Sequence, residues 1–100
     1  MDIKITKQED CIIVATEGRI DTITAKDFEA SVMGILDGEC SNIVVDCEKL
    51  SYISSSGLRI FLILQKGINA KNGKLVLRSM NNSIKEIFKI TGFASIFSIE

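Results

Sequence analysis

Three consecutive serines followed by a glycine form the stretch of this sequence that is best suited to chemistry. Ser54, Ser55 and Ser56 precede Gly57 and an apolar run with the length of a helix. The first four N–H groups of a helix lack partners within it, and a serine hydroxyl can accept a hydrogen bond from one of them as an N-cap. One serine suffices for that role. The residues alone therefore leave two interpretations open: capping only, or a hydroxyl that is free for function.

A nucleophilic serine would need a general base, and the chain has no histidine, the usual base and the commonest metal ligand. Lys49 or a carboxylate would have to serve, and the Gly-x-Ser-x-Gly pattern of serine hydrolases is absent. A phosphoacceptor needs less, because a kinase partner supplies the base, the metal and the nucleotide. If one of these hydroxyls is free for function, the sequence therefore favours a phosphoacceptor without enzyme activity, with a small hydrolase that uses Ser56 as the enzyme alternative.

A second polar loop contains Gly18, Arg19, Asp21 and Thr22. We expect it at the same end of the sheet as the serines, because both loops lead from a strand into a helix in adjoining crossovers. Asp21 or Thr22 can cap the following helix. Alternatively, Asp21 lies beside the serines and helps to form a surface that a partner protein binds.

The composition fits one globular domain, residues 1–100, with 46% apolar and 25% charged residues. A net charge of −1 gives no electrostatic footprint for nucleic acid or for a membrane surface. The first 50 residues carry 5 basic and 11 acidic side chains, whereas the last 50 carry 7 basic and 2 acidic ones. This asymmetry favours a protein partner, and nothing in the chain predicts a small-molecule substrate.

No segment is apolar enough to cross a membrane or to act as a secretory signal, so we expect a cytoplasmic protein. The longest uncharged stretch covers only residues 90–99, and Asp2, Glu9 and Asp10 interrupt the N-terminal region. Three cysteines without a Cys-x-x-Cys spacing predict neither a zinc site nor a disulfide framework, and no cofactor is expected. We interpret Cys11 and Cys47 as small core residues in strands.

The hydrophobic pattern predicts an α/β fold with a mixed sheet of four to five strands, in the order β-β-α-β-α-β-α-(β). Strands are predicted around Ile3–Ile5, from Cys11 to about Glu17, at Ile43–Val45, at Leu75–Leu77 and, as a short edge strand, at Ile96–Ile99. A first helix is predicted between a cap at Thr24 and a stop at Gly38, with Phe28, Val32, Ile35 and Leu36 at helical spacing; further helices are predicted at about Ser55–Ala70 and from Asn81–Ser83 to Thr91–Gly92.

Three details of these elements bear on the site. The β-branched run at Ile43–Val45 predicts a strand that is covered on both faces. Residues 46–54 are expected to link this strand to the second helix. Thr24 and Asp27 have the order of a capping-box variant for the first helix.

The motifs together resemble the STAS domain of bacterial anti-sigma factor antagonists over nearly the whole chain. The resemblance rests on Gly18-Arg19-Ile20-Asp21, Ile43-Val44-Val45-Asp46, Tyr52-Ile53-Ser54-Ser55-Ser56-Gly57-Leu58-Arg59 and Ile87-Phe88-Lys89-Ile90-Thr91-Gly92-Phe93. It implies a single domain without a cofactor that binds a serine kinase, itself an anti-sigma factor. The unphosphorylated antagonist would capture this kinase and release a sigma factor, and a metal-dependent serine phosphatase would restore it after phosphorylation.

The resemblance assigns the phosphorylation to Ser56, whereas geometry alone leaves Ser55 and Ser54 open. Ser54 stands where the family pattern has an aspartate, and Asp21 matches an acidic residue of the family near the phosphoserine. Arg59 lies three residues after Ser56 and could pair with the phosphate.

Spare apolar residues of the second helix, Ile60 and Ile63 or Leu64, are expected to form part of a docking surface. The expected partner-binding residues are Asp21, Thr22, Ser54, Ser55, Gly57, Arg59 and Ile60. The alternative function is a STAS scaffold that is never phosphorylated and acts in a larger signalling assembly.

Overall fold

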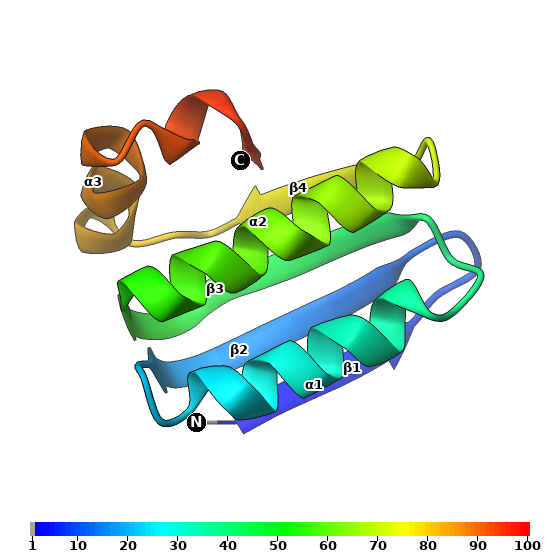
Figure 1. The fold of residues 1–100 in the computed structure, drawn as a ribbon, viewed down its shortest axis with the longest axis horizontal. Helices are drawn as coiled ribbons and strands as arrows, with labels where there is room; N and C mark the ends of the chain where they lie inside the picture. Colours follow the sequence, from blue (N-terminus) through cyan, green and yellow to red (C-terminus); the bar gives the residue numbers. More distant parts are fainter. Residues whose placement is uncertain (1) are drawn as a thin grey trace.

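Five strands and three helices follow one another in the predicted order in the computed structural model, which describes residues 2–100 (Figure 1). The elements are β1 (Asp2–Lys7), β2 (Ile12–Ile20), α1 (Ala25–Leu36), β3 (Asn42–Ile53), α2 (Ser55–Ala70), β4 (Lys74–Arg78), α3 (Asn82–Ile90), a short 3-10 helix η1 (Phe93–Ser95) and β5 (Ser98–Ile99). The predicted α/β fold with a mixed sheet is confirmed. No helix among these residues combines the length and apolar character that a membrane span requires.

The strands lie in the sheet in the order in which they occur in the sequence, β1-β2-β3-β4-β5. β1 is antiparallel to β2, and all other neighbours are parallel. Parallel neighbours require crossovers, and right-handed crossovers that advance in one direction place their helices on the same face. Figure 1 shows α1 and α2 side by side over that face.

This strand order keeps the two halves of the chain apart. The acidic first half forms β1, β2 and α1 at one edge of the sheet, and the basic second half forms α2, β4 and α3 toward the other edge (Figure 1). The charge asymmetry of the sequence therefore persists as an acidic and a basic side of the molecule.

Two strands extend further than the sequence pattern predicts. β2 continues to Ile20 instead of ending near Glu17, and β3 continues to Ile53, so the prediction of a linker at residues 46–54 is wrong. Two register shifts in the β2–β3 pairing, between Ala15 and Glu17 and between Gly18 and Arg19, break the strict alternation that identifies a strand in a sequence.

The prediction that the third strand is covered on both faces is also wrong. Ile43 and Val45 of β3 are buried, whereas Val44 between them is only half-buried. This alternation is that of a sheet with one face packed under helices and one face more open. A short β-branched run does not by itself distinguish the two cases, because branched side chains suit either face of a sheet.

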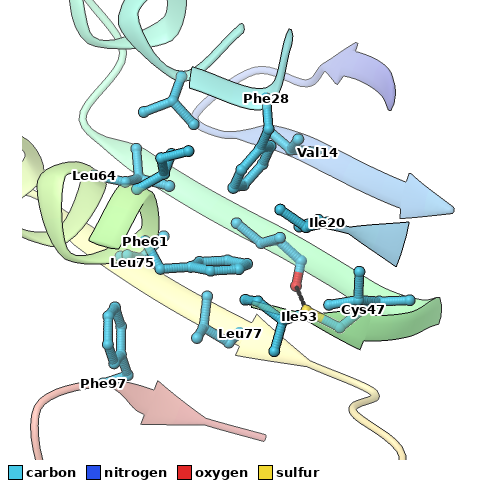
Figure 2. Close-up of a cluster of buried hydrophobic side chains, with 14 of the residues drawn as sticks. Val14, Ile20, Phe28, Cys47, Ile53, Phe61, Leu64, Leu75, Leu77 and Phe97 are labelled. Carbon is cyan, nitrogen blue, oxygen red and sulfur yellow. Dashed lines mark hydrogen bonds between the residues drawn. The ribbon is translucent and has the colours of Figure 1, made fainter. Parts of the chain in front are cut away.

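The helix-covered face holds a core that is centred on Phe61 of α2 (Figure 2). The centroid of the Phe61 ring lies 5.2 Å from the ring centroid of Phe28 in α1 and 5.9 Å from that of Phe88 in α3. The ring centroid of Phe97 lies 6.3 Å away, and all three pairs have tilted or edge-to-face geometry. One aromatic side chain therefore connects both central helices with the C-terminal region.

Cys47 lies in this core, as predicted, and burial raises the pKa of its thiol to about 12, so the thiol stays protonated. Cys11, predicted as a core residue of a strand, instead lies half-buried at the residue before β2. The start of α3 is as predicted: Asn81 caps it by accepting from the Ile84 N–H at 2.9 Å.

Replacement of the central ring is expected to be costly. Phe61→Ala should lower the free energy of unfolding by about 3–5 kcal/mol, because it removes apolar burial and leaves a cavity among three other rings. Urea denaturation measures the loss. Phe93→Ala is the matched control, since Phe93 is half-buried at the rim of the same cluster. Equal losses in the two variants would contradict the central role of Phe61.

Candidate functional site

The carboxyl ends of β2 and β3 bring the two polar loops of the sequence together. Ile20 and Ile53 are paired in the parallel register, and the Ser54 N–H donates to the Ile20 carbonyl oxygen at 2.8 Å. The Asp21 turn (residues 21–24) follows Ile20 directly, and the serine turn (residues 54–57) follows Ile53. The two turns therefore lie side by side at one edge of the sheet.

Gly57 allows the close approach of the first turn of α2 to the end of β2. A Cβ atom at this position would lie 2.7 Å from Cγ2 of Ile20 and 2.8 Å from Cγ1 of Ile53, closer than packed atoms tolerate. Gly57 is buried, so the expectation that it faces a partner is wrong. Its role is to position the serine turn against β2.

The structure distinguishes the serine that caps α2 from the two serines whose hydroxyls are free in the described chain. Ser54 is the N-cap of α2: its backbone is extended, and its Oγ accepts from the Gly57 N–H at 3.3 Å. Ser55 is exposed and Ser56 is half-buried. Within residues 2–100, neither of these two hydroxyls takes part in a hydrogen bond, and the N–H groups of Ser55 and Ser56 have no backbone acceptor. Two hydroxyls thus remain without a structural task at a helix start that can bind an anion.

The Asp21 turn is held by a reciprocal pair of side chains. Oδ1 of Asp21 accepts from the N–H groups of Ile23 and Thr24, both at 3.0 Å. Oγ1 of Thr24 accepts from the Asp21 N–H at 2.9 Å and donates to the Arg19 carbonyl oxygen at 2.8 Å. The predicted Thr24–Asp27 capping box is therefore wrong, because Thr24 makes no side-chain cap to α1 and bonds backward to Asp21.

These contacts keep Asp21 ionised. The Thr24 N–H is the largest influence that lowers the pKa of the carboxyl group below its ordinary value of 3.8, and the Ile23 N–H, the Thr24 hydroxyl and the Arg19 charge act in the same direction. Arg19 itself stacks on Tyr52, with its guanidinium carbon 4.3 Å from the ring centroid. The turn therefore presents a fixed negative charge beside a fixed positive one.

The expected apolar docking residues on α2 lie elsewhere. Ile60 is only 2% exposed and Leu64 only 1%, so neither can contact a partner; Ile63 is half-buried. The prediction for Ile60 is wrong because α2 is covered on a wider face than one apolar stripe, with α1 and α3 on its flanks. Arg59 is exposed, as expected.

Sequence reasoning missed Ile23, which is 84% exposed in the Asp21 turn beside the exposed Thr22. The available signal was an isolated apolar residue between two threonines, outside the spacing of any strand or helix. Within residues 2–100 no group of three or more His, Cys, Asp or Glu side chains could hold a metal ion. The edge offers free hydroxyls, a helix start, an ionised carboxylate and an exposed isoleucine, which suit modification and protein binding.

A comparison with protein families matches residues 2–100 to the STAS domain. The chain belongs to the STAS domain family. The resemblance read from the sequence motifs is thereby confirmed over the whole described chain. This family assignment agrees with the position of the serine turn between β3 and α2.

Individual relatives agree with the assignment. The chain is 32% identical over 99 residues to BtrV of Bordetella bronchiseptica, which is described as a candidate anti-sigma factor antagonist; the match covers 99% of this chain and 85% of BtrV. Its fold is similar to that of a Thermotoga maritima protein described in the same way, with a TM-score of 0.91, 19% identity and coverage of 97% and 84% of the two chains. It is also similar to the Bacillus cell fate determinant SpoIIAA in its phosphorylated form, with a TM-score of 0.78, 17% identity and coverage of 99% and 91%.

Removal of the N-cap should destabilise the STAS domain measurably. Ser54→Ala is expected to lower the free energy of unfolding by about 0.5–2 kcal/mol, because the Gly57 N–H loses its acceptor. Ser55→Ala is the matched control and should change stability by less than about 0.5 kcal/mol, since its hydroxyl has no partner among the described residues. Urea denaturation of both variants tests this, and a larger loss for Ser55→Ala would contradict the assignment of the cap.

The lowered pKa of Asp21 predicts a pH dependence of stability. Because the carboxyl group binds its proton less readily in the folded than in the unfolded protein, its contribution is present above about pH 5 and is lost as the pH falls through the folded-state pKa. The free energy of unfolding of Asp21→Asn should therefore fall less steeply than that of the wild type between about pH 5 and pH 2. Parallel curves for the two proteins would rule out this contribution.

Proposed function

We propose that this protein is an anti-sigma factor antagonist whose binding to an anti-sigma factor serine kinase is switched off by phosphorylation of Ser56. The observation that carries the proposal is the free Ser56 hydroxyl at the start of α2, where Ser54 already supplies the cap. The names of its relatives support the same class of function, and a structural neighbour exists in a phosphorylated form. Family resemblance selects Ser56 over Ser55.

The proposed phosphate is compatible with the folded domain. At the start of α2 it would meet the unpartnered N–H groups of the first turn and the positive end of the helix dipole, which favour an anion by roughly 0.3–1 kcal/mol. No acidic residue occupies the first turn of α2, and the exposed Arg59 lies one turn further on. Phosphorylation should therefore leave the fold intact, and the switch would act at the interface with the partner.

The added charge explains how the interface would be released. A phosphoserine carries about −1.5 to −2 charges, and Asp21 already places an ionised carboxylate at the same edge. Burial of that charge against an apolar partner surface would lower the affinity by roughly a few hundredfold, which corresponds to about 3–4 kcal/mol. In the unphosphorylated state the same surface would bind the kinase and free the sigma factor.

The proposed function places the protein in the cytoplasm with a kinase and a phosphatase as partners. The domain would act in the cytoplasm without catalysis or a cofactor of its own, because the kinase supplies the nucleotide chemistry and a serine phosphatase reverses it. Thr22, Ser55 and Arg59, all exposed around Ser56, would belong to the surface that these partners contact.

Incubation of this protein with ATP and the serine kinase whose gene lies nearest to its own should add one phosphate, on Ser56. Intact mass followed by peptide mapping measures this, and the phosphorylated protein should bind the kinase a few hundredfold more weakly. Ser55→Ala should still accept the phosphate, whereas Ser56→Ala should not. If the kinase binds the protein and transfers nothing, phosphorylation is excluded and the scaffold function takes its place.

A further inference from the structure

Ile23 is the most exposed of the large apolar side chains in the described structure, at 84%. It lies at the tip of the Asp21 turn, between the exposed Thr22 and the partly covered Thr24. A single exposed apolar residue is common on protein surfaces and needs no explanation by itself. Ile23 differs because of how its backbone is held and where the turn lies.

The backbone of Ile23 is fixed before any partner arrives. Its N–H donates to Oδ1 of Asp21 at 3.0 Å, and the carboxylate accepts from the next N–H as well. Thr24 closes the turn: its hydroxyl accepts from the Asp21 N–H at the start of the turn and donates to the carbonyl oxygen of Arg19, two residues before it. A side chain on a backbone that is already ordered loses little further conformational freedom on binding, so more of its burial appears as affinity.

The turn is continuous with the serine turn. The Ser54 N–H to Ile20 hydrogen bond and the contact of Gly57 with Ile20 join the two turns through a residue that is completely buried. A partner that covers Ser56 would therefore also reach the Asp21 turn. Exposed polar residues lie close to Ile23 in the chain, among them Thr22 and Lys26, and a polar rim is usual around an apolar anchor at a protein interface.

Asp21 adds a second element of recognition. Only Oδ1 of its carboxylate holds the turn; Oδ2 has no hydrogen-bond partner within residues 2–100. The low pKa keeps this oxygen negatively charged. It can accept from an arginine or lysine of a partner while Oδ1 continues to support Ile23.

We infer that Ile23 is the apolar anchor by which this protein binds its anti-sigma factor kinase, inserted into an apolar pocket of the kinase that carries a basic side chain beside Asp21. The inference rests on the proposed function and adds the specificity-determining residue of that interface. It replaces Ile60, which the sequence suggested and the fold buries.

The test measures the affinity of the unphosphorylated protein for the kinase by isothermal titration calorimetry. Ile23→Ala should weaken binding by roughly 10-fold to 100-fold, the effect of losing one buried aliphatic side chain, and Ile23→Asp should weaken it further. Ile23→Leu should stay within about threefold of the wild type, since it keeps the apolar volume. Thermal unfolding should be nearly unchanged in all three variants, because the side chain is 84% exposed in the folded domain.

Ile90→Asp is the matched control. Ile90 is 75% exposed at the end of α3 and belongs to neither the Asp21 turn nor the serine turn, so this change should leave the affinity unaltered. Wild-type affinity of Ile23→Asp, or equal losses in Ile23→Asp and Ile90→Asp, would overturn the anchor and leave the proposed function standing. Absence of any binding by the wild type would overturn both.

Discussion

The parallel pairing of β2 and β3 up to Ile20 and Ile53 is the constraint on which the rest of this molecule depends. Because both strands end at the same level, the loops that follow them begin side by side. Gly57 then lets the first turn of α2 rest on Ile20 without a Cβ between them. A pairing that ended at Glu17, where the strand pattern fades, would leave the Asp21 turn and the serine turn without a common base.

At this edge of the sheet, some polar groups hold the fold while neighbouring groups, or a second oxygen of the same side chain, have no hydrogen-bond partner in the described chain. Ser54 caps α2, which leaves the hydroxyls of Ser55 and Ser56 without internal partners in the described chain. Oδ1 of Asp21 holds its turn, whereas Oδ2 is available. Such a surface can be modified or bound without breaking the contacts that maintain it, which is what a reversible protein switch requires.

The arrangement of the core explains how the edge stays rigid. Phe61 of α2 packs against rings from α1, α3 and the C-terminal region, so the helix that carries the serine turn is held to these elements close to its start (Figure 2). A charge added at the start of such a helix has no weakly packed element to displace. Its effect is confined to the surface and therefore to partners.

The sequence by itself determined the order of the elements, the extents of the helices, the serine cap region and the family. These follow from local rules: helical spacing, residues that suit caps, and glycines that end helices. The sequence also predicted that Asp21 and the serines lie at the same edge of the sheet, because both loops lead from a strand into a helix in adjoining crossovers. Which serine caps the helix remained open, since any of the three satisfies the local requirement.

The extents of β2 and β3 and the burial of Ile60 were decided by tertiary structure, and the exposure of Ile23 by the geometry of the closed Asp21 turn. The two strands are extended by pairing with each other across register shifts that disrupt the local pattern. Ile60 is buried because other elements lie on the flank of α2, and Ile23 is exposed in a turn whose backbone Asp21 and Thr24 hold. Each depends on contacts between residues distant in the chain or on the geometry of a closed turn, which residue type and spacing do not specify.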